Sequence, residues 1–452
     1  MPLTVSPRIF LLAALAAAPL SSAVIGTSKP AESITPSRIA TLPVKERAAW
    51  MAYLERSQKQ MQMDRATLAG ERAAAAPEPP MPKEGFSART MPLNREAAWY
   101  GTPEARHVAD AIVSFQTPAG GWSKNLDMSA GPRLPGQSYT PDNLSKQPGP
   151  DDFDTPKDPH WNYVGTLDND ATNTELHFLA LVSGATPGAA GDVYRASFVR
   201  GIRYLLAAQF PNGGWPQVWP LEGGYHDAIT YNDNAVTESA QTLTAVADGA
   251  ENYTFVPAEL RSQARTSASR ALQCILATQV IAKGRRTVWA QQHDALTLAP
   301  VSGRNYEPAA LSSGESADVV LYLMQLPHPS RAVVAAVDAA VAWLKSAAIT
   351  GQEWVGGRGD PKGRHLEAKA GAGPIWARYY SMTTGLPVFG DRDKTIHDDV
   401  NELSLERRNG YAWYSASPQQ ALDTYGAWSQ NHGNKQHGSK DHGGSGRQRP
   451  GI

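Results

Sequence analysis

The sequence predicts a mainly α fold: an α/α-toroid-like helical domain with long glycine-rich loops and few short strands. Three observations support this expectation. Apolar residues recur at spacings of three and four along the body of the chain, whereas strand-like alternation is scarce. Two expected helices end in the same Gln-x-x-x-Gly-Gly-Trp phrase. Helix pairs joined by such turns at one end suggest a toroid whose loops form a groove at one rim.

The N-terminus has the features of a signal peptide. Arg8 precedes the apolar run Ile9 to Leu20, and Ser21 and Ala23 are the small residues of a cleavage site after position 23. The apolar run is too short to span a bilayer. We therefore expect residues 1–23 to be removed and the protein to be secreted or periplasmic, with a buried N-terminal helix as the alternative.

Two more segments flank the body. Residues 24–93 are expected to form an extension with a short amphipathic helix between Val44 and Leu68 and a proline-rich linker. This extension is expected to pack loosely on the body or to act as a tether. Residues 429–452 form a Gly- and His-rich tail with too little apolar surface to order itself. A solvated tail is favoured over a transition-metal site at its histidines, which are His432, His437 and His442.

The body, residues 94–428, carries seven segments with helical periodicity. In the first of them, Val108, Ile112 and Phe115 lie on one face. The seven expected helices are residues 105–116, 174–183, 194–209, 236–246, 266–279, 316–325 and 332–347.

The repeated phrase runs from Gln116 to Trp122 and again from Gln209 to Trp215. Its proline stops the helix, its glycines allow positive φ in a sharp turn, and its tryptophan returns to the core or to a cleft wall. A weaker echo ends at Trp289, and another is expected to end at Trp413.

Composition limits the partners of the protein. Among 452 residues, 42 are Lys or Arg and 43 are Asp or Glu, so the formal net charge is −1. This near-neutral charge argues against nucleic-acid binding and against attachment to an anionic membrane, and an anionic partner would need a local cluster of cations. The single cysteine, Cys274, excludes an intramolecular disulfide and a CxxC metal site.

Two loop clusters carry hard oxygen ligands. The phrase Asp168-Asn169-Asp170 precedes one expected helix, and Asn232-Asp233-Asn234 opens another. Each cluster alone is more typical of a helix N-cap. Because both follow the repeated phrase, a shared Ca²⁺ site is the functional interpretation.

Arginine alternates with aromatic residues in two further clusters. One runs from Arg285-Arg286 to Arg304-Asn-Tyr-Glu307, and the other contains Trp-Ala-Arg378-Tyr-Tyr and Gly-Asp-Arg392-Asp. Guanidinium groups pair with carboxylates, and aromatic faces stack on sugar rings. Together with the cation ligands, these clusters point to an acidic polysaccharide as the ligand.

These phrases, taken in order, resemble the pectate lyases of polysaccharide lyase family 10 over residues 94–428. The resemblance implies a catalytic lyase domain that cleaves de-esterified homogalacturonan by β-elimination, aided by Ca²⁺. It implies that Arg392 is the base that removes the C5 proton and that Asp168 and Asp233 hold the calcium ion. The substrate-binding residues that it implies are Arg378, Arg304, Lys124 and Asn169. We expect a monomer that binds polygalacturonate oligosaccharides.

Three other interpretations stay open at this point. Asp168 and Asp233 are also candidates for the two carboxylates of a glycoside hydrolase acting on an acidic polysaccharide. A non-catalytic pectate-binding protein would carry the same arginines. The Gln-x-x-x-Gly-x-Trp phrase also occurs in terpene cyclases, but the Asp-x-Asp-Asp acid motif is absent here.

Overall fold

The computed structural model describes residues 24–75, 77–147, 149, 151–156, 158–357 and 359–433. The predicted signal peptide and the tail beyond residue 433 lie outside the described residues. Within the described part of the chain, no helix is both long and apolar enough to cross a membrane.

Eight helices pack in two antiparallel rows, and the seven helices expected in the body are confirmed. One row contains α4 (Pro103–Phe115), α6 (Asp192–Ala208), α8 (Ala258–Thr278) and α10 (Arg331–Ala347). The other contains α5 (Asn173–Ala185), α7 (Ala235–Asp248), α9 (Ser313–Gln325) and α12 (Pro418–Gly433). Helix α12 thus extends into the stretch that the sequence assigned to the tail.

The turn that contains the repeated phrase connects one helix pair to the next. The side-chain amide of Gln116 donates to the carbonyl oxygens of Gly120 (2.7 Å) and of Ser197 in α6 (2.9 Å). The amide of Gln209 makes the same two bonds, to Gly213 (2.8 Å) and to Ser267 in α8 (3.0 Å). The repeat is therefore a structural device that closes the turn and fixes the next helix of the row.

The tryptophans of the repeat are fully buried and anchor the turns. The indole N–H of Trp122, Trp215 and Trp289 donates to a carbonyl of the helix that precedes each turn, at 2.6, 2.8 and 2.7 Å. After α10 the equivalent bond comes from Trp376 to Leu344 (2.8 Å). The indole N–H of Trp413 also donates to a carbonyl of the helix before it, that of Arg407 in α11 (Leu405–Gly410), at 3.1 Å. The expected echo at Trp413 therefore makes the same kind of bond, but it follows a short helix outside the two rows.

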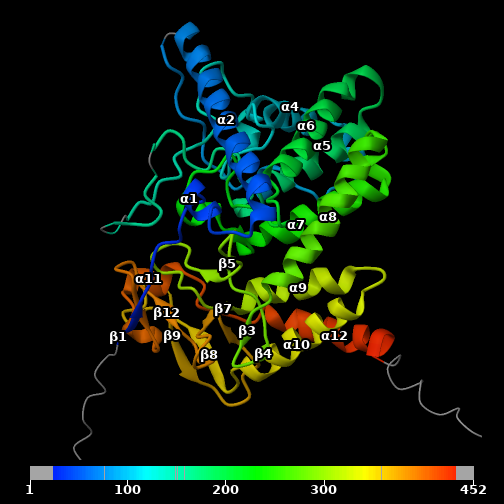
Figure 1. Cartoon of the computed structure of the whole chain (residues 1–452). Helices are drawn as coiled ribbons and strands as arrows, with labels where there is room; N and C mark the ends of the chain where they lie inside the picture. Colours follow the sequence, from blue (N-terminus) through cyan, green and yellow to red (C-terminus); the bar gives the residue numbers. More distant parts are fainter. Residues whose placement is uncertain are drawn as a thin grey trace, which may run out of the picture.

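The expectation of an α/α toroid is wrong. The two rows form an open array that descends from α4 at the top of Figure 1 to α12 at the bottom, and they do not close into a ring. Helices also share the molecule with six small antiparallel sheets in the described residues. The repeated turn fixes how one pair meets the next, but ring closure depends on the rotation accumulated over all pairs, which the motif does not encode.

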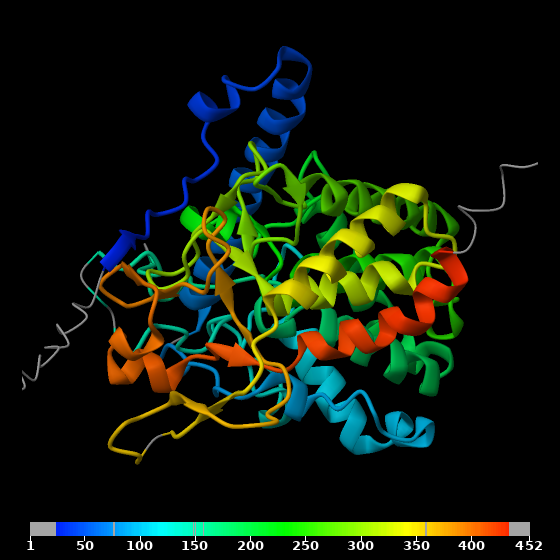
Figure 2. The ribbon, with the colours of Figure 1, turned by 90° about the horizontal axis from the view of Figure 1, so that it is seen from below.

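The sheets lie on one side of the array, as both ribbon views show (Figures 1 and 2). Two of them have three strands: β1 (Val24–Thr27), β13 (Thr395–His397) and β12 (Phe389–Gly390); and β2 (Ile229–Thr230), β5 (Gln292–His293) and β6 (Pro300–Val301). The two-stranded pairs are β7 (Leu311–Ser312) with β11 (Tyr379–Tyr380), β10 (Trp376–Ala377) with β14 (Tyr414–Ser415), β3 (Ile281–Ala282) with β4 (Arg285–Arg286), and β8 (Gln352–Val355) with β9 (His365–Ala368).

The N-terminal extension contains α1 (Pro36–Ile39), the long helix α2 (Val44–Ala74) and α3 (Ser87–Thr90), so the helix expected after Val44 is confirmed. Helix α2 buries Trp50 and Tyr53 against Phe210, which follows α6, with ring centroids 5.4 and 5.2 Å apart. The hydroxyl of Tyr53 donates to the carbonyl of Ala208 (2.9 Å). The extension is thereby part of the hydrophobic core. The expectation that it packs loosely on the body or acts as a tether is wrong, because its aromatic side chains complete the core beside α6.

Candidate active site

All the long loops of the array gather at one end. Short connections join α5 to α6, α7 to α8 and α9 to α10, while long segments precede α5, α7, α9 and α12. Because neighbouring helices are antiparallel, the N-termini of α5, α7 and α9 point to the long-loop end. Helix N-termini carry partial positive charge, so this end favours anions. The sequence-predicted site residues lie here.

The acidic pair sits just before α5 and α7. Asp168 begins the short 3₁₀ segment Asp168–Asp170, and Asp233 is in the middle of Asn232–Asn234. The side-chain amide of Asn232 donates to both carboxylates, at 3.3 Å to Asp168 and 2.8 Å to Asp233. The backbone N–H of Asn169 also donates to Asp233 (3.2 Å). The two clusters therefore lie in direct contact with each other.

The pKa values of Asp168 and Asp233 are shifted in opposite directions because their surroundings differ. Burial opposes ionisation of Asp168, but the charges of Lys124 and Arg304 outweigh it and lower the pKa of this carboxyl. Burial and the neighbouring Asp168 charge raise the pKa of Asp233. Asp168 is held by Lys124 Nζ at 2.5 Å and by the amide of Gln217 at 2.6 Å. A buried like-charged pair of this kind is stabilised by either a shared proton or a cation.

The donor set fits a hard divalent cation. Two carboxylates face each other, and oxygen ligands of this type suit Ca²⁺. No group of three or more His, Cys, Asp or Glu side chains converges for a metal in the described ranges. The protein side would therefore supply two carboxylates, leaving further coordination positions for substrate or water oxygens.

Arg378 contacts the same asparagine that binds the acidic pair. It lies between β10 and β11, and its guanidinium donates to Asn232 Oδ1 (3.1 Å) and to Glu315 in α9 (2.5 Å). The guanidinium carbon lies 4.7 Å from the centroid of the Tyr411 ring. Asn232 thus links the predicted carboxylate-binding arginine to both predicted calcium ligands.

Lys124, Arg304 and Arg392 line one cavity of about 310 Å³. Five of its lining side chains are cationic and two are carboxylates, on a chain whose net charge is −1. The five cations are Lys124, Lys146, Arg304, Arg392 and Arg407. This is the local cluster of positive charge that an anionic partner requires.

The two cavity arginines that the sequence predicted, Arg304 and Arg392, are held differently. Arg304 Nε lies 3.2 Å from the buried carboxylate of Glu307, and this guanidinium also lowers the pKa of Asp168. Arg392 follows β12 and pairs through Nε (2.7 Å) and Nη2 (3.1 Å) with Glu406 of α11 (Leu405–Gly410). The bonds to Glu406 raise the pKa of Arg392.

Some residues that the sequence singled out lie elsewhere. Arg285 and Arg286 form the exposed strand β4, where Arg286 bonds to Gln279 at the end of α8. Asp170 points into a separate cavity that it shares with His177 and Glu238. Neither feature belongs to the cationic cavity.

The sequence did not single out several residues that complete the site. Asp154 accepts hydrogen bonds from the hydroxyls of Tyr163 (3.0 Å) and Tyr225 (2.5 Å) and lines the cationic cavity. Lys124 Nζ lies 3.4 Å from the centroid of the Tyr163 ring. Asp154 comes from a loop without a motif, so no sequence signal marks it.

Arg407 is the second omission. It is 4% exposed, stacks at 4.2 Å on the Tyr306 ring and lines the cationic cavity. The phrase Arg-Arg-Asn-Gly-Tyr-Ala-Trp413 does combine arginine with aromatic residues, which is the pattern that identified Arg304 and Arg378. That signal was present and would have pointed to this arginine.

Comparison with known proteins identifies the family of the chain. The family model described as pectic acid lyase matches residues 116–422. A family 10 polysaccharide lyase from Cellvibrio cellulosa has 28% sequence identity and a TM-score of 0.61, covering 77% of this chain and 99% of that chain. No curated protein matches the sequence.

A second solved structure is the D189A mutant of the Cellvibrio cellulosa family 10 lyase, in complex with trigalacturonic acid. It has the same identity and TM-score and covers 78% of this chain and 99% of that chain. The family model spans more than half of the sequence, including both acidic clusters and all three predicted arginines. The chain therefore belongs to the pectic acid lyase family and is an enzyme, a pectate lyase.

Proposed function

We propose that this pectate lyase cleaves de-esterified homogalacturonan by calcium-assisted β-elimination with an arginine base. The observation that carries the proposal is the paired carboxylates Asp168 and Asp233 beside a cavity with an excess of cations. The complex of the Cellvibrio cellulosa lyase mutant with trigalacturonic acid supports the substrate class. Each residue of that polymer carries one carboxylate, which suits a site rich in arginine.

The chemistry needs positive charge around one uronate. Removal of the proton at C5, which is α to the carboxylate, creates an enolate-like dianion, and the electron pair then expels the oxygen at C4. A calcium ion bound by Asp168 and Asp233 would stabilise this developing charge electrostatically. Arg378 and the cations of the cavity orient the carboxylates of the sugar chain. The product carries a C4–C5 double bond, and the leaving oxygen takes up a proton.

Two arginines compete for the role of base. The family resemblance assigns it to Arg392, whose guanidinium is held by Glu406. Arg304 is the alternative, because its positive charge acts to lower the pKa of both Asp168 and Asp233. A calcium ion next to Arg304 would favour its neutral form.

Lysine replacement separates the two roles. Lysine has an ordinary pKa about two units below that of arginine. The R392K and R304K variants are compared by pH–rate profiles. In the variant that replaces the base, the alkaline limb of kcat moves to lower pH, whereas in a variant that replaces a carboxylate-binding arginine KM rises and the limb stays in place. If the alkaline limb of kcat stays in place in both variants, the proposal of an arginine base is refuted.

The decisive test of function is an absorbance assay on polygalacturonate. The unsaturated product absorbs in the ultraviolet, EDTA abolishes the signal, and added Ca²⁺ restores it. Chain cleavage without ultraviolet absorbance would indicate a hydrolase, and binding without turnover would indicate a non-catalytic protein. Retention of full activity in EDTA would refute the calcium site.

We further propose that the protein is exported after cleavage behind Ala23 and acts as a monomer. The basic residue, apolar run and small residues of the leader support export. N-terminal sequencing of the protein recovered from outside the cytoplasm should begin at Val24. Light scattering should give the mass of one chain.

A further inference from the structure

The first residues after the predicted leader form an edge strand next to the Arg392 turn. Strand β1 (Val24–Thr27) pairs antiparallel with β13, and β13 pairs with β12. The turn between β12 and β13 carries Asp391, Arg392, Asp393 and Lys394. Beyond β1, the backbone N–H of Ser28 donates to the carbonyl of Lys394 (2.8 Å). Strand β1 and the turn that carries a candidate catalytic arginine therefore belong to one sheet.

The same segment is fastened at its other end near the Arg304 loop. Arg38 pairs with Asp294 at 2.5 Å, and the Asp294 side chain is 8% exposed. Asp294 in turn accepts hydrogen bonds from the backbone N–H of Leu296 (3.0 Å) and of Thr297 (2.8 Å). This ordered loop leads into β6 and then to Arg304.

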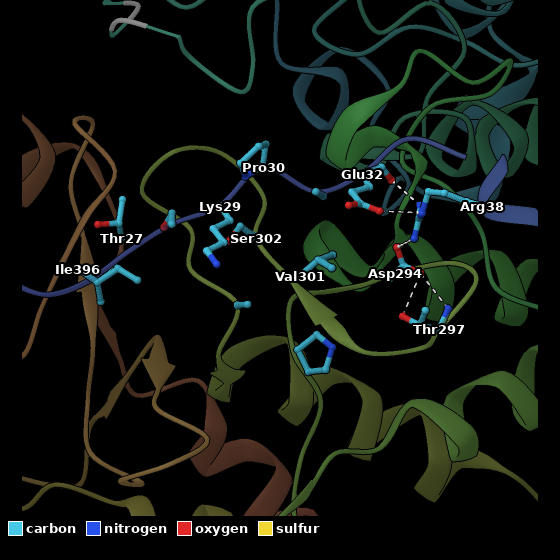
Figure 3. A pocket seen from close by; sticks show the side chains of 14 residues that line it. Thr27, Lys29, Pro30, Glu32, Arg38, Asp294, Thr297, Val301, Ser302 and Ile396 are labelled. Atoms are coloured by element: carbon cyan, nitrogen blue, oxygen red, sulfur yellow. Dashed lines mark hydrogen bonds and ion pairs between the residues drawn. The ribbon is translucent and has the colours of Figure 1, made fainter. Parts of the chain in front are cut away.

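Between these attachment points the segment crosses a hollow. A cavity of about 540 Å³ separates residues Thr27–Glu32 from Val301 and Ser302. Figure 3 shows the segment running from Thr27, beside Ile396, to Arg38, which points at Asp294. The segment thus spans open space between Thr27 and Glu32. It is held before this stretch by β1 and after it by the hydrogen bonds of Ser33 to Gly224 and of Ile34 to Asp227 and by the Arg38 ion pair, which is the arrangement of a strap.

We propose that residues Val24–Arg38, here called the N-terminal strap, position the two arginine-bearing turns of the active site. The strap adds the third strand that holds the β12–β13 turn and clamps the loop before Arg304. Reacting groups displaced by about 1 Å lose about a hundredfold in rate, so such bracing matters for catalysis. The inference rests on the proposed role of Arg392 in the lyase reaction.

The test breaks one attachment at a time in the full chain. S28P removes the N–H that bonds to Lys394, and S28A keeps it and serves as the matched control. We expect S28P to lower kcat/KM on polygalacturonate about tenfold, and S28A to match the wild type. Since Val24 and Ile25 are 54% and 48% exposed, deletion of Val24–Thr27 leaves the core intact. This deletion serves as a second variant with the same expected effect.

A double-variant cycle with R392A distinguishes positioning from general destabilisation. If the strap acts through Arg392, S28P adds no further loss in the R392A background, whereas a loss caused by general destabilisation multiplies with that of R392A. Equal activity of S28P and S28A, or multiplicative losses, would overturn the strap inference. If R392A itself retains full activity, the proposed role of Arg392 fails and the strap inference falls with it.

Discussion

Replacement of Asp168 by asparagine tests the centre of the site. D168N keeps the side-chain volume, so it creates no cavity, but it removes the charge that faces Lys124 Nζ at 2.5 Å. The Lys124 side chain is 10% exposed and would lose its ion-pair partner. Removing one partner of a buried ion pair costs about 3–5 kcal/mol.

The Lys124 ammonium keeps its contact with the Tyr163 ring, centred 3.4 Å away. This contact is the same in both proteins, so it does not reduce the cost. We therefore expect D168N to lower the free energy of unfolding by about 3–5 kcal/mol. Because a preorganised electrostatic contact is also lost, we expect kcat to fall by about 10²–10³.

The assays are urea unfolding followed by circular dichroism and the ultraviolet lyase assay with a calcium titration. In the double variant D168N/K124M, the unpaired charge is gone, so most of the stability should return while activity stays low. Wild-type activity and calcium response in D168N would refute the site. Equal stability loss in D168N and in the double variant would refute the ion-pair argument.

Three further predictions follow from the fold and the chemistry. With arginine as the base, the lyase should have a strongly alkaline optimum, and an optimum near about pH 6 would contradict it. Burial raises the pKa of Glu175 to about 8, so the folded state keeps a proton that the unfolded chain releases, and the free energy of unfolding should fall as pH rises from about 4 to about 8. E175Q should flatten that slope in urea unfolding at a series of pH values, and an unchanged slope would assign it to other groups. An alanine Cβ at Gly213 (φ +99°) would lie 2.2 Å from the Arg270 carbonyl oxygen, whereas one at Gly284 (φ +73°) would meet no atom within 4 Å. In thermal unfolding, G213A should therefore cost well over the roughly 1–2 kcal/mol of left-handed strain expected for G284A, and equal costs would contradict the clash.

Local sequence signals predicted much of this architecture. Helical periodicity located the seven helices of the body because an amphipathic face is written into consecutive residues. The Gln-x-x-x-Gly-Gly-Trp phrase marked real turns for the same reason: its glutamine, glycines and tryptophan act within one turn and on the helices beside it. The acidic clusters and three arginines were recognisable because residue type alone suggests cation and carboxylate binding.

Other features depend on groups far apart in the chain. The open array replaced the expected toroid because interhelical packing, rather than any single turn, sets the rotation from pair to pair. Asp154 and Arg407 reach the site only because loops far apart in the sequence meet in space. For the same reason, the sequence did not predict the pairing of Arg392 with Glu406 or the pairing of β1 with the strand that follows the Arg392 turn.

The amino-acid sequence by itself therefore determined the helices, the turns and the identity of the charged groups, because these are properties of neighbouring residues. Only the tertiary structure decided which charges face one another. A buried carboxylate such as Asp168 acquires its ionisation from Lys124 and Arg304, which are remote in sequence and adjacent in space.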